Sequence, residues 1–103
     1  MPPRIEQLQA ILQREPNDAF CLYGLAMEYV KMGRLDEAIA HFDLAITANP
    51  RDSYVYFHKA KAQQQAGDIP AARESLRRGL EQARATADAK AMSEIAAFLD
   101  ELA

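Results

Sequence analysis

Apolar residues recur at steps of three and four along most of this chain of 103 residues, which is the spacing of one helix face. Between residues 19 and 32, for example, Leu22, Leu25, Ala26 and Tyr29 share one face. The same spacing returns in other segments, with polar residues between the apolar ones. The pattern predicts six amphipathic helices, at about residues 3–14, 19–32, 35–49, 53–67, 68–84 and 88–102.

Residues that start or stop helices stand between these segments. Asp18 is typical of an N-cap, and Gly33 suits the left-handed conformation that ends many helices. Pro50 prevents continuation of the third helix, because proline has no amide hydrogen to donate. The stretch 85–88 is typical of a lengthened turn, with Asp88 as the N-cap of the last helix. The predicted boundaries therefore have local chemical causes.

The helices belong to an internal repeat with a period of 34 residues. At this offset Ala26 corresponds to Ala60, and Pro16 corresponds to Pro50. After Arg84 the period breaks, and an offset of 36 restores the match through an insertion of two residues. A single domain over 1–103 is therefore expected, made of a half-repeat helix, two repeats and a last helix that caps them, at 3–14, 19–52, 53–84 and 88–102.

The first whole unit resembles the tetratricopeptide repeat, a family whose 34-residue repeat places large, small and proline residues at set positions. Those positions hold Leu22, Leu25, Ala26, Tyr29, Ala38, Phe42 and Pro50. The resemblance covers essentially the whole chain. It implies an all-α fold, a right-handed α-solenoid of stacked antiparallel helix hairpins with six helices. Small residues such as Ala38 would lie where paired helices cross closely.

The second unit departs from the family pattern at several of these positions. Lys59 and Gln63 stand where Leu and Tyr are expected, Gly79 replaces a small Ala, and Arg84 replaces Pro. The helical hairpin remains the expectation for this unit. The departures predict looser packing of the unit against the last helix.

The resemblance also implies where a partner would bind, because tetratricopeptide repeats are generally protein-interaction scaffolds with a concave groove. That groove is lined by the first helix of each repeat. The positions carried over to this sequence are Phe20, Tyr23, Met27, Val30, Lys31, Tyr54, Phe57, His58 and Lys61. Aromatic and Met side chains are favoured in protein interfaces. The expected function is non-enzymatic binding of another protein, as a peptide or a helix. For each of these residues, the alternative is that its side chain packs against adjoining helices.

The last predicted helix offers a second surface, since no partner helix follows it in the sequence. Its apolar stripe consists of Met92, Ile95, Phe98, Leu99 and Leu102. Part of the stripe is expected to cap the second unit, and the remainder could pack on another copy of the chain. Homodimerisation through this edge is therefore the alternative function, with two-fold self-complementary contacts as its simplest form.

Composition and charge exclude several other classes. Twenty residues are Ala, whereas Val, Ile and Thr together number ten, which disfavours a β fold. The net charge of −3 gives no basic excess for nucleic acid, and no apolar run is long enough to cross a membrane. His41 and His58 have no ligand partner at metal-binding spacing, so no metal, cofactor or catalytic site is expected. The single cysteine, Cys21, favours a cytoplasmic location.

Overall fold

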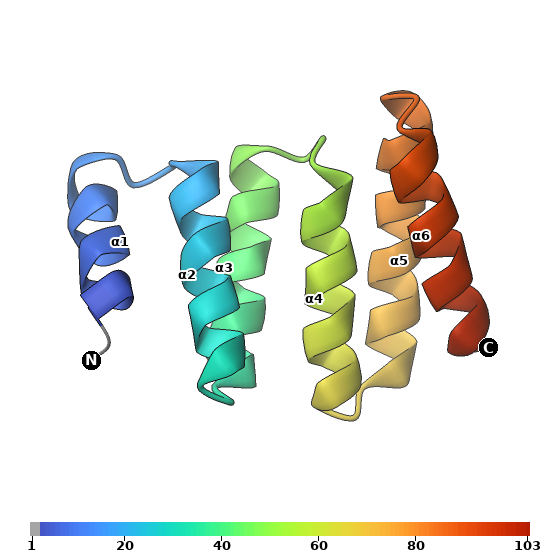
Figure 1. Ribbon diagram of the computed structural model, residues 1–103, viewed down its shortest axis with the longest axis horizontal. Helices are drawn as coiled ribbons and strands as arrows, with labels where there is room; N and C mark the ends of the chain where they lie inside the picture. The colour runs from blue at the N-terminus through green and yellow to red at the C-terminus, as the bar shows by residue number, and fades with distance from the viewer. Residues whose placement is uncertain (1–2) are drawn as a thin grey trace.

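The computed structural model describes residues 3–103, and this part of the chain consists of six helices and short turns with no strand (Figure 1). The number of helices agrees with the prediction from the apolar pattern. The helices are α1 Pro3–Arg14, α2 Ala19–Lys31, α3 Leu35–Ala48, α4 Ser53–Gln65, α5 Ile69–Ala85 and α6 Ala89–Glu101.

Aspartate side chains begin four of the helices. Asp18, Asp52, Asp68 and Asp88 each accept a hydrogen bond from a backbone amide in the first turn of α2, α4, α5 and α6, respectively. These amides have no partner within the helix, so the carboxylate satisfies a group that would otherwise need water. The helix starts are therefore fixed locally by the sequence, as the spacing of the aspartates predicted.

The turns after α2, α4 and α5 share one geometry. Gly33 and Gly67 have φ angles of +74° and +84°, which glycine adopts without steric cost. Ala87 takes the same left-handed conformation, at φ +55°, in the turn between α5 and α6. At each turn the residue after this position donates its amide hydrogen to a carbonyl five residues earlier, the bond that closes a Schellman cap.

The helices stack in chain order along the long axis of the molecule, and α1 and α6 lie at opposite ends of the array (Figure 1). The most extensive contacts join α2 to α3 and α4 to α5, which form two antiparallel hairpins. Helix α1 packs on α2, and α6 packs on α5, with a smaller contact to α4. The result is the α-solenoid expected from the repeat, with overall extents of 38 × 29 × 18 Å.

Buried side chains form two clusters that meet within α4. The first joins α1, α2, α3 and part of α4, and its largest members include Ile5, Leu25 and Phe42. The second joins α4, α5 and α6 around Leu76 and Ile95. The predicted crossing residues Ala26, Ala38, Ala45, Ala60 and Ala72 are all essentially inaccessible to solvent. Small side chains thus let the paired helices approach closely, as the repeat pattern required.

The second hairpin is not loosely packed against the last helix, so that prediction was wrong. Helix α5 contacts α6 about as extensively as α3 contacts α4. At Gly79, a Cβ atom would lie 2.7 Å from Cβ of Tyr56 and 3.4 Å from Cδ1 of Ile95. Glycine therefore marks the closest approach of three helices rather than a gap. The loss of the usual Ala methyl group lets α5 move in, which the sequence pattern alone does not show.

The polar departures of the second unit have partners as well. Nζ of Lys59 lies 2.5 Å from Oδ1 of Asp43 and joins α4 to α3. The hydroxyl of Ser75 donates a hydrogen bond of 2.7 Å to Oε1 of Gln63, between α5 and α4, and both side chains are buried. These pairs satisfy groups whose burial would otherwise be costly. They hold α4 between its two neighbours.

Candidate partner-binding groove

A row of four rings crosses the first helix of each repeat. The ring of Tyr23 on α2 lies 5.7 Å from that of His58 on α4, measured between centroids. Phe57, the neighbour of His58 in the sequence, lies 5.4 Å from His58 and 5.4 Å from Phe98 on α6. Such tilted and edge-on contacts suit the charge distribution of aromatic rings. The row joins three helices that are distant in the sequence into one surface.

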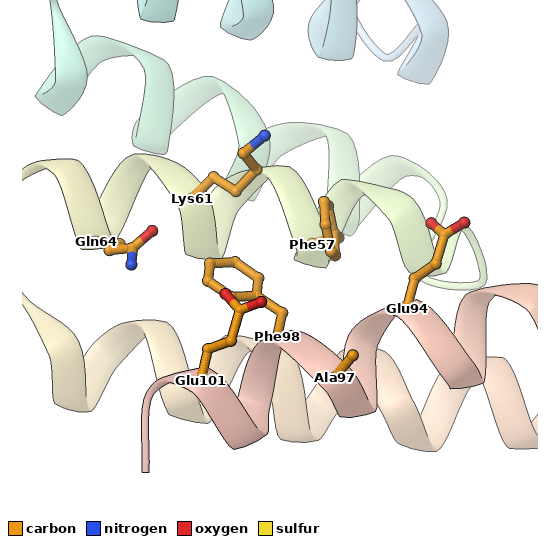
Figure 2. A pocket seen from close by; sticks show the side chains of 7 residues that line it. All are labelled: Phe57, Lys61, Gln64, Glu94, Ala97, Phe98 and Glu101. Atoms are coloured by element: carbon orange, nitrogen blue, oxygen red, sulfur yellow. The ribbon is translucent and has the colours of Figure 1, made fainter.

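At the C-terminal end of this row a pocket of about 420 Å³ lies between α4 and α6, here called the α4–α6 pocket (Figure 2). It is lined by Phe57, Lys61, Gln64, Glu94, Ala97, Phe98 and Glu101. Its apolar floor comes from both helices, because Phe57 and Phe98 meet edge to face. The volume falls in the range of ordinary ligand sites.

At the other end of the row, a second pocket of about 350 Å³ lies between the start of α2 and the start of α4, here called the α2–α4 pocket. It is lined by Ala19, Phe20, Tyr23, Ala45, Asn49, Asp52 and Val55. Phe20 is 74% exposed, the largest exposure among the large apolar side chains of the described residues. Tyr23 therefore contributes both to this pocket and to the row of rings, so the two pockets are ends of one continuous surface.

The titratable groups on this surface respond to burial and to nearby carboxylates. Burial, followed by the charge of Asp52, raises the pKa of Tyr23. Burial and the charge of Lys61 lower the pKa of His58, although Asp52 acts in the opposite direction. Folding therefore favours the neutral form of the His58 imidazole. Lys61 lies 5.8 Å from the centre of the Phe57 ring, close enough for a cation–π contact.

The structure brings together most of the predicted groove residues, but not all of them. Phe20, Tyr23, Phe57 and Lys61 line the two pockets, and His58 joins them. Tyr54 lies beside Phe57, with ring centroids 6.4 Å apart.

Five predicted groove residues line neither pocket. Two of them, Tyr54 and His58, have rings next to that of Phe57, and the other three are Met27, Val30 and Lys31. Met27 and Val30 are half-buried against the first core cluster, and Nζ of Lys31 pairs with Glu28 at 3.0 Å. Tyr23 and Phe57 are also half-buried and packed on the core, so their bulk contributes to folding as well as to the surface.

Sequence reasoning missed the contribution of α6 to this surface. Glu94, Ala97, Phe98 and Glu101 all line the α4–α6 pocket. The signal was available, because the offset of 36 residues places Glu94 and Ala97 at the positions of His58 and Lys61. Extending the groove positions to the last helix would have found them. Phe98 has no such equivalent among the groove positions of the earlier units.

The proposed self-association stripe is divided by the structure. Ile95 is completely inaccessible and packs in the second core cluster, so it is not available to another copy of the chain. Phe98 is only 8% exposed, because its ring turns towards Phe57 on α4. Met92, Leu99 and Leu102 remain half-buried at the margin of the same cluster.

Elsewhere the described residues offer few groups for chemistry. Residues 3–103 contain no group of three or more His, Cys, Asp or Glu side chains able to hold a metal ion. Cys21 is buried, as expected of a small packed residue, and burial together with the charge of Asp18 raises the pKa of its thiol. A raised pKa disfavours the reactive thiolate. No helix in this part of the chain has the length and apolar character needed to span a membrane.

The family follows from a direct sequence match. The sequence model of the tetratricopeptide repeat matches residues 5–56 and 29–95. The chain belongs to the tetratricopeptide repeat family. The TPR repeat-containing protein PA0015 of Pseudomonas aeruginosa is 31% identical over 98 residues, which are 95% of this chain and 93% of that relative.

Solved structures of this family share the fold. PcrH, in complex with the chaperone binding region of PopD, superposes with a TM-score of 0.88 over 95% of this chain and 74% of its own, at 20% identity. The TPR2B domain of yeast Sti1, in its pHsp70 complex, gives 0.88 over 95% and 78%, at 23% identity. BPP2914 of Bordetella parapertussis gives 0.84 over 99% and 89%, at 26% identity. The predicted all-α tetratricopeptide fold is therefore confirmed.

Proposed function

We propose that this protein is a non-enzymatic interaction module that binds a segment of another protein across α2, α4 and α6. The observation that supports this most directly is the row Tyr23–His58–Phe57–Phe98, which joins two pockets on one surface. Two of the structurally similar proteins are solved in complexes with a region of PopD and with pHsp70.

The chemistry of the row fits an apolar anchor. Aromatic side chains supply a large contact area and lose little conformational freedom when a partner binds, and interface energy concentrates in a few such residues. Phe57 and Phe98 present ring surface to the α4–α6 pocket, and the largely exposed Phe20 lies at the far end of the row. An apolar side chain of the partner would be covered on two sides in the α4–α6 pocket.

The first test fills the pocket without removing a core residue. Ala97 is exposed on α6 and lines the α4–α6 pocket, so Ala97→Gln places a longer, helix-compatible side chain where a partner would lie. We expect affinity capture from cells to lose the partner, or isothermal titration with an identified partner segment to show at least tenfold weaker binding. Ala40→Gln on α3 is the matched control, because Ala40 is also exposed and lines neither pocket.

A second pair of variants removes the anchors. Tyr23→Ala and Phe57→Ala should each weaken binding by about 1 kcal/mol or more. Both residues also pack on the core, so circular dichroism and a thermal melt must accompany the binding assay. Folded variants that bind as well as the wild type, together with an inert Ala97→Gln, would contradict the proposal.

Self-association is the second candidate function, and one observation favours it. In the repeat, Met92 and Leu99 occupy the positions of Tyr56 and Gln63, which in α4 are buried against the following helix α5. On α6 Met92, Leu99 and Leu102 remain half-buried. Leu102→Glu should convert a dimer into a monomer in sedimentation, and a wild-type monomer at high concentration would exclude this function.

A further inference from the structure

The two walls of the α4–α6 pocket differ in charge. Two carboxylates, those of Glu94 and Glu101, rise from α6 on either side of Phe98, whereas Lys61 on α4 is the one cation among the lining residues (Figure 2). In Figure 2 the Lys61 ammonium points away from α6, while both carboxylates stand over the groove. The negative charge therefore faces the space that a partner would occupy.

These carboxylates have no cation of their own in the part of the chain that the structure describes. Several other acidic side chains on the array are paired with a cation, as Glu28 is with Lys31 and Glu37 with Arg34. No Lys or Arg among residues 3–103 lies within 4.0 Å of Glu94 or Glu101. Two carboxylates without an ion-pair partner, beside an apolar floor, are an arrangement that a bound cation would satisfy.

More negative charge lies along the same surface. Burial, followed by the charge of Glu94, a hydrogen bond with it and the charge of Asp88, raises the pKa of the Tyr54 hydroxyl. After burial, the charge of Asp52 likewise raises the pKa of Tyr23. The chain as a whole carries a net charge of −3. Attraction of a positively charged partner would therefore begin before contact, because the summed field steers association.

The spacing of the carboxylates defines what they could recognise together. Glu94 and Glu101 are seven residues apart, or two helical turns and about 10.5 Å along α6, and Phe98 lies between them on the same face. In an extended segment, four residues cover about 13 Å. Flexible Arg or Lys side chains two positions on either side of an apolar residue could reach both carboxylates.

From this geometry we infer that the α4–α6 pocket takes a basic segment of a partner protein, an apolar residue flanked on both sides by Arg or Lys. The apolar residue packs against Phe57 and Phe98, and the flanking cations pair with Glu94 and Glu101. The inference rests on the proposed function, since it names the chemistry of the partner at one end of the same groove.

The test uses three series of fluorescein-labelled twelve-residue peptides with a central leucine. The residues two positions to each side are arginine in one series, serine in the second and glutamate in the third, and fluorescence anisotropy gives the affinities for the full chain. We expect the arginine series to bind about threefold to tenfold more tightly than the serine series, and the glutamate series to bind most weakly. The preference should decrease as salt rises.

Variants locate the source of the preference. Glu94→Gln with Glu101→Gln should bring the arginine and serine series to equal affinity. Glu6→Gln with Glu81→Gln removes the same net charge from exposed positions outside the pocket and should leave the preference unchanged. A preference for glutamate peptides, an equal loss in both double variants, or no measurable binding of the arginine series would overturn the inference.

Failure of the inference differs from failure of the proposed function. If all three series bind equally and Ala97→Gln weakens them all, the groove binds partners without selecting for charge. If the peptides bind and Ala97→Gln has no effect on any series, the binding surface lies elsewhere, and both proposals are wrong.

Discussion

The two hairpins of this molecule have the same helix arrangement, but they place large and small side chains differently at the contact between their two helices. In the first hairpin Leu22 on α2 and Ala45 on α3 occupy the positions that Tyr56 and Gly79 hold in the second. All four residues are buried. The second hairpin therefore combines a larger side chain on one helix with the smallest residue on the other. The comparison shows that the combined volume of the two facing side chains is limited, rather than the volume at either position alone. A close-packed interior tolerates little extra volume.

A second pair of positions differs in chemistry. Tyr29 and His41 face each other across the first hairpin, with ring centroids 5.1 Å apart. The equivalent Gln63 and Ser75 in the second hairpin are joined by a buried hydrogen bond of 2.7 Å. The same contact between two helices is thus made by rings in one hairpin and by a polar pair in the other. A buried polar pair is more demanding, since loss of either partner leaves the other unsatisfied.

The largest expected effect separates the two mid-helix glycines. Gly79→Ala should destabilise the fold by about 2 kcal/mol or more, because the new Cβ would lie 2.7 Å from Cβ of Tyr56, an atom that cannot rotate away. Gly24→Ala on α2 is the matched control, since its Cβ would meet only side-chain atoms at 3.5 Å or more. That control should be neutral or stabilising by up to about 1 kcal/mol. Urea unfolding measures both, and equal effects would remove the argument for a close approach.

The next effect concerns the polar pair. Ser75→Ala should cost about 1–3 kcal/mol, because it leaves the buried oxygen of Gln63 without a donor. The double variant Gln63→Leu with Ser75→Ala should recover much of the loss, since neither polar group then remains buried. A double-mutant cycle by urea unfolding measures the coupling. Additive losses would show that the two side chains do not interact.

The turns provide a smaller effect. Ala87→Gly should stabilise the chain by about 1 kcal/mol, because an L-residue in the left-handed region carries a steric cost that glycine avoids. Gly33→Ala, in the first hairpin, should destabilise the chain by a similar free energy, although nothing lies within 4 Å of the new Cβ. Thermal melts compare the two variants. A stabilising Gly33→Ala would contradict the assigned turn geometry.

The smallest effect is the response to pH. The pKa of His58 is lowered on folding, by burial first and then by Lys61, so the unfolded chain takes up a proton before the folded chain does. The contribution of neutral His58 to the free energy of unfolding should therefore be fully present above about pH 6.5 and decrease as the pH falls below it. His58→Gln should reduce this decrease between about pH 6.5 and 5. Urea midpoints across this range measure the effect.

Much of the fold was predictable because its causes are local. The aspartate N-caps, the turn glycines and the 34-residue recurrence of small residues each act within a few positions or repeat along the chain. The close approach at Gly79 was not predictable, because it depends on Tyr56 and Ile95 from two other helices. The family pattern treated Gly79 as a defect, whereas the structure shows a compensated contact.

The candidate groove was predicted less completely than the fold. Tyr23 and Phe57 were found because they occupy repeated positions on the first helix of each unit. Phe98 was assigned to the proposed self-association stripe of α6. No helix follows α6, so the sequence pattern does not separate the apolar side that packs on the earlier helices from the apolar side that stays uncovered. The direction of Phe98 depends on how the turn at Ala87 sets the rotation of α6 against α5 and α4.

The order in which the helices touch has a consequence for how the chain folds. Every extensive contact joins helices one or two places apart along the chain, and none joins the N-terminal half of the described array to α6. The loops that must close during folding are therefore short, and the contact order is low. Helical chains of this kind fold within roughly microseconds to milliseconds. Either hairpin could form first and serve as the surface on which its neighbours dock, so folding can proceed in both directions along the array.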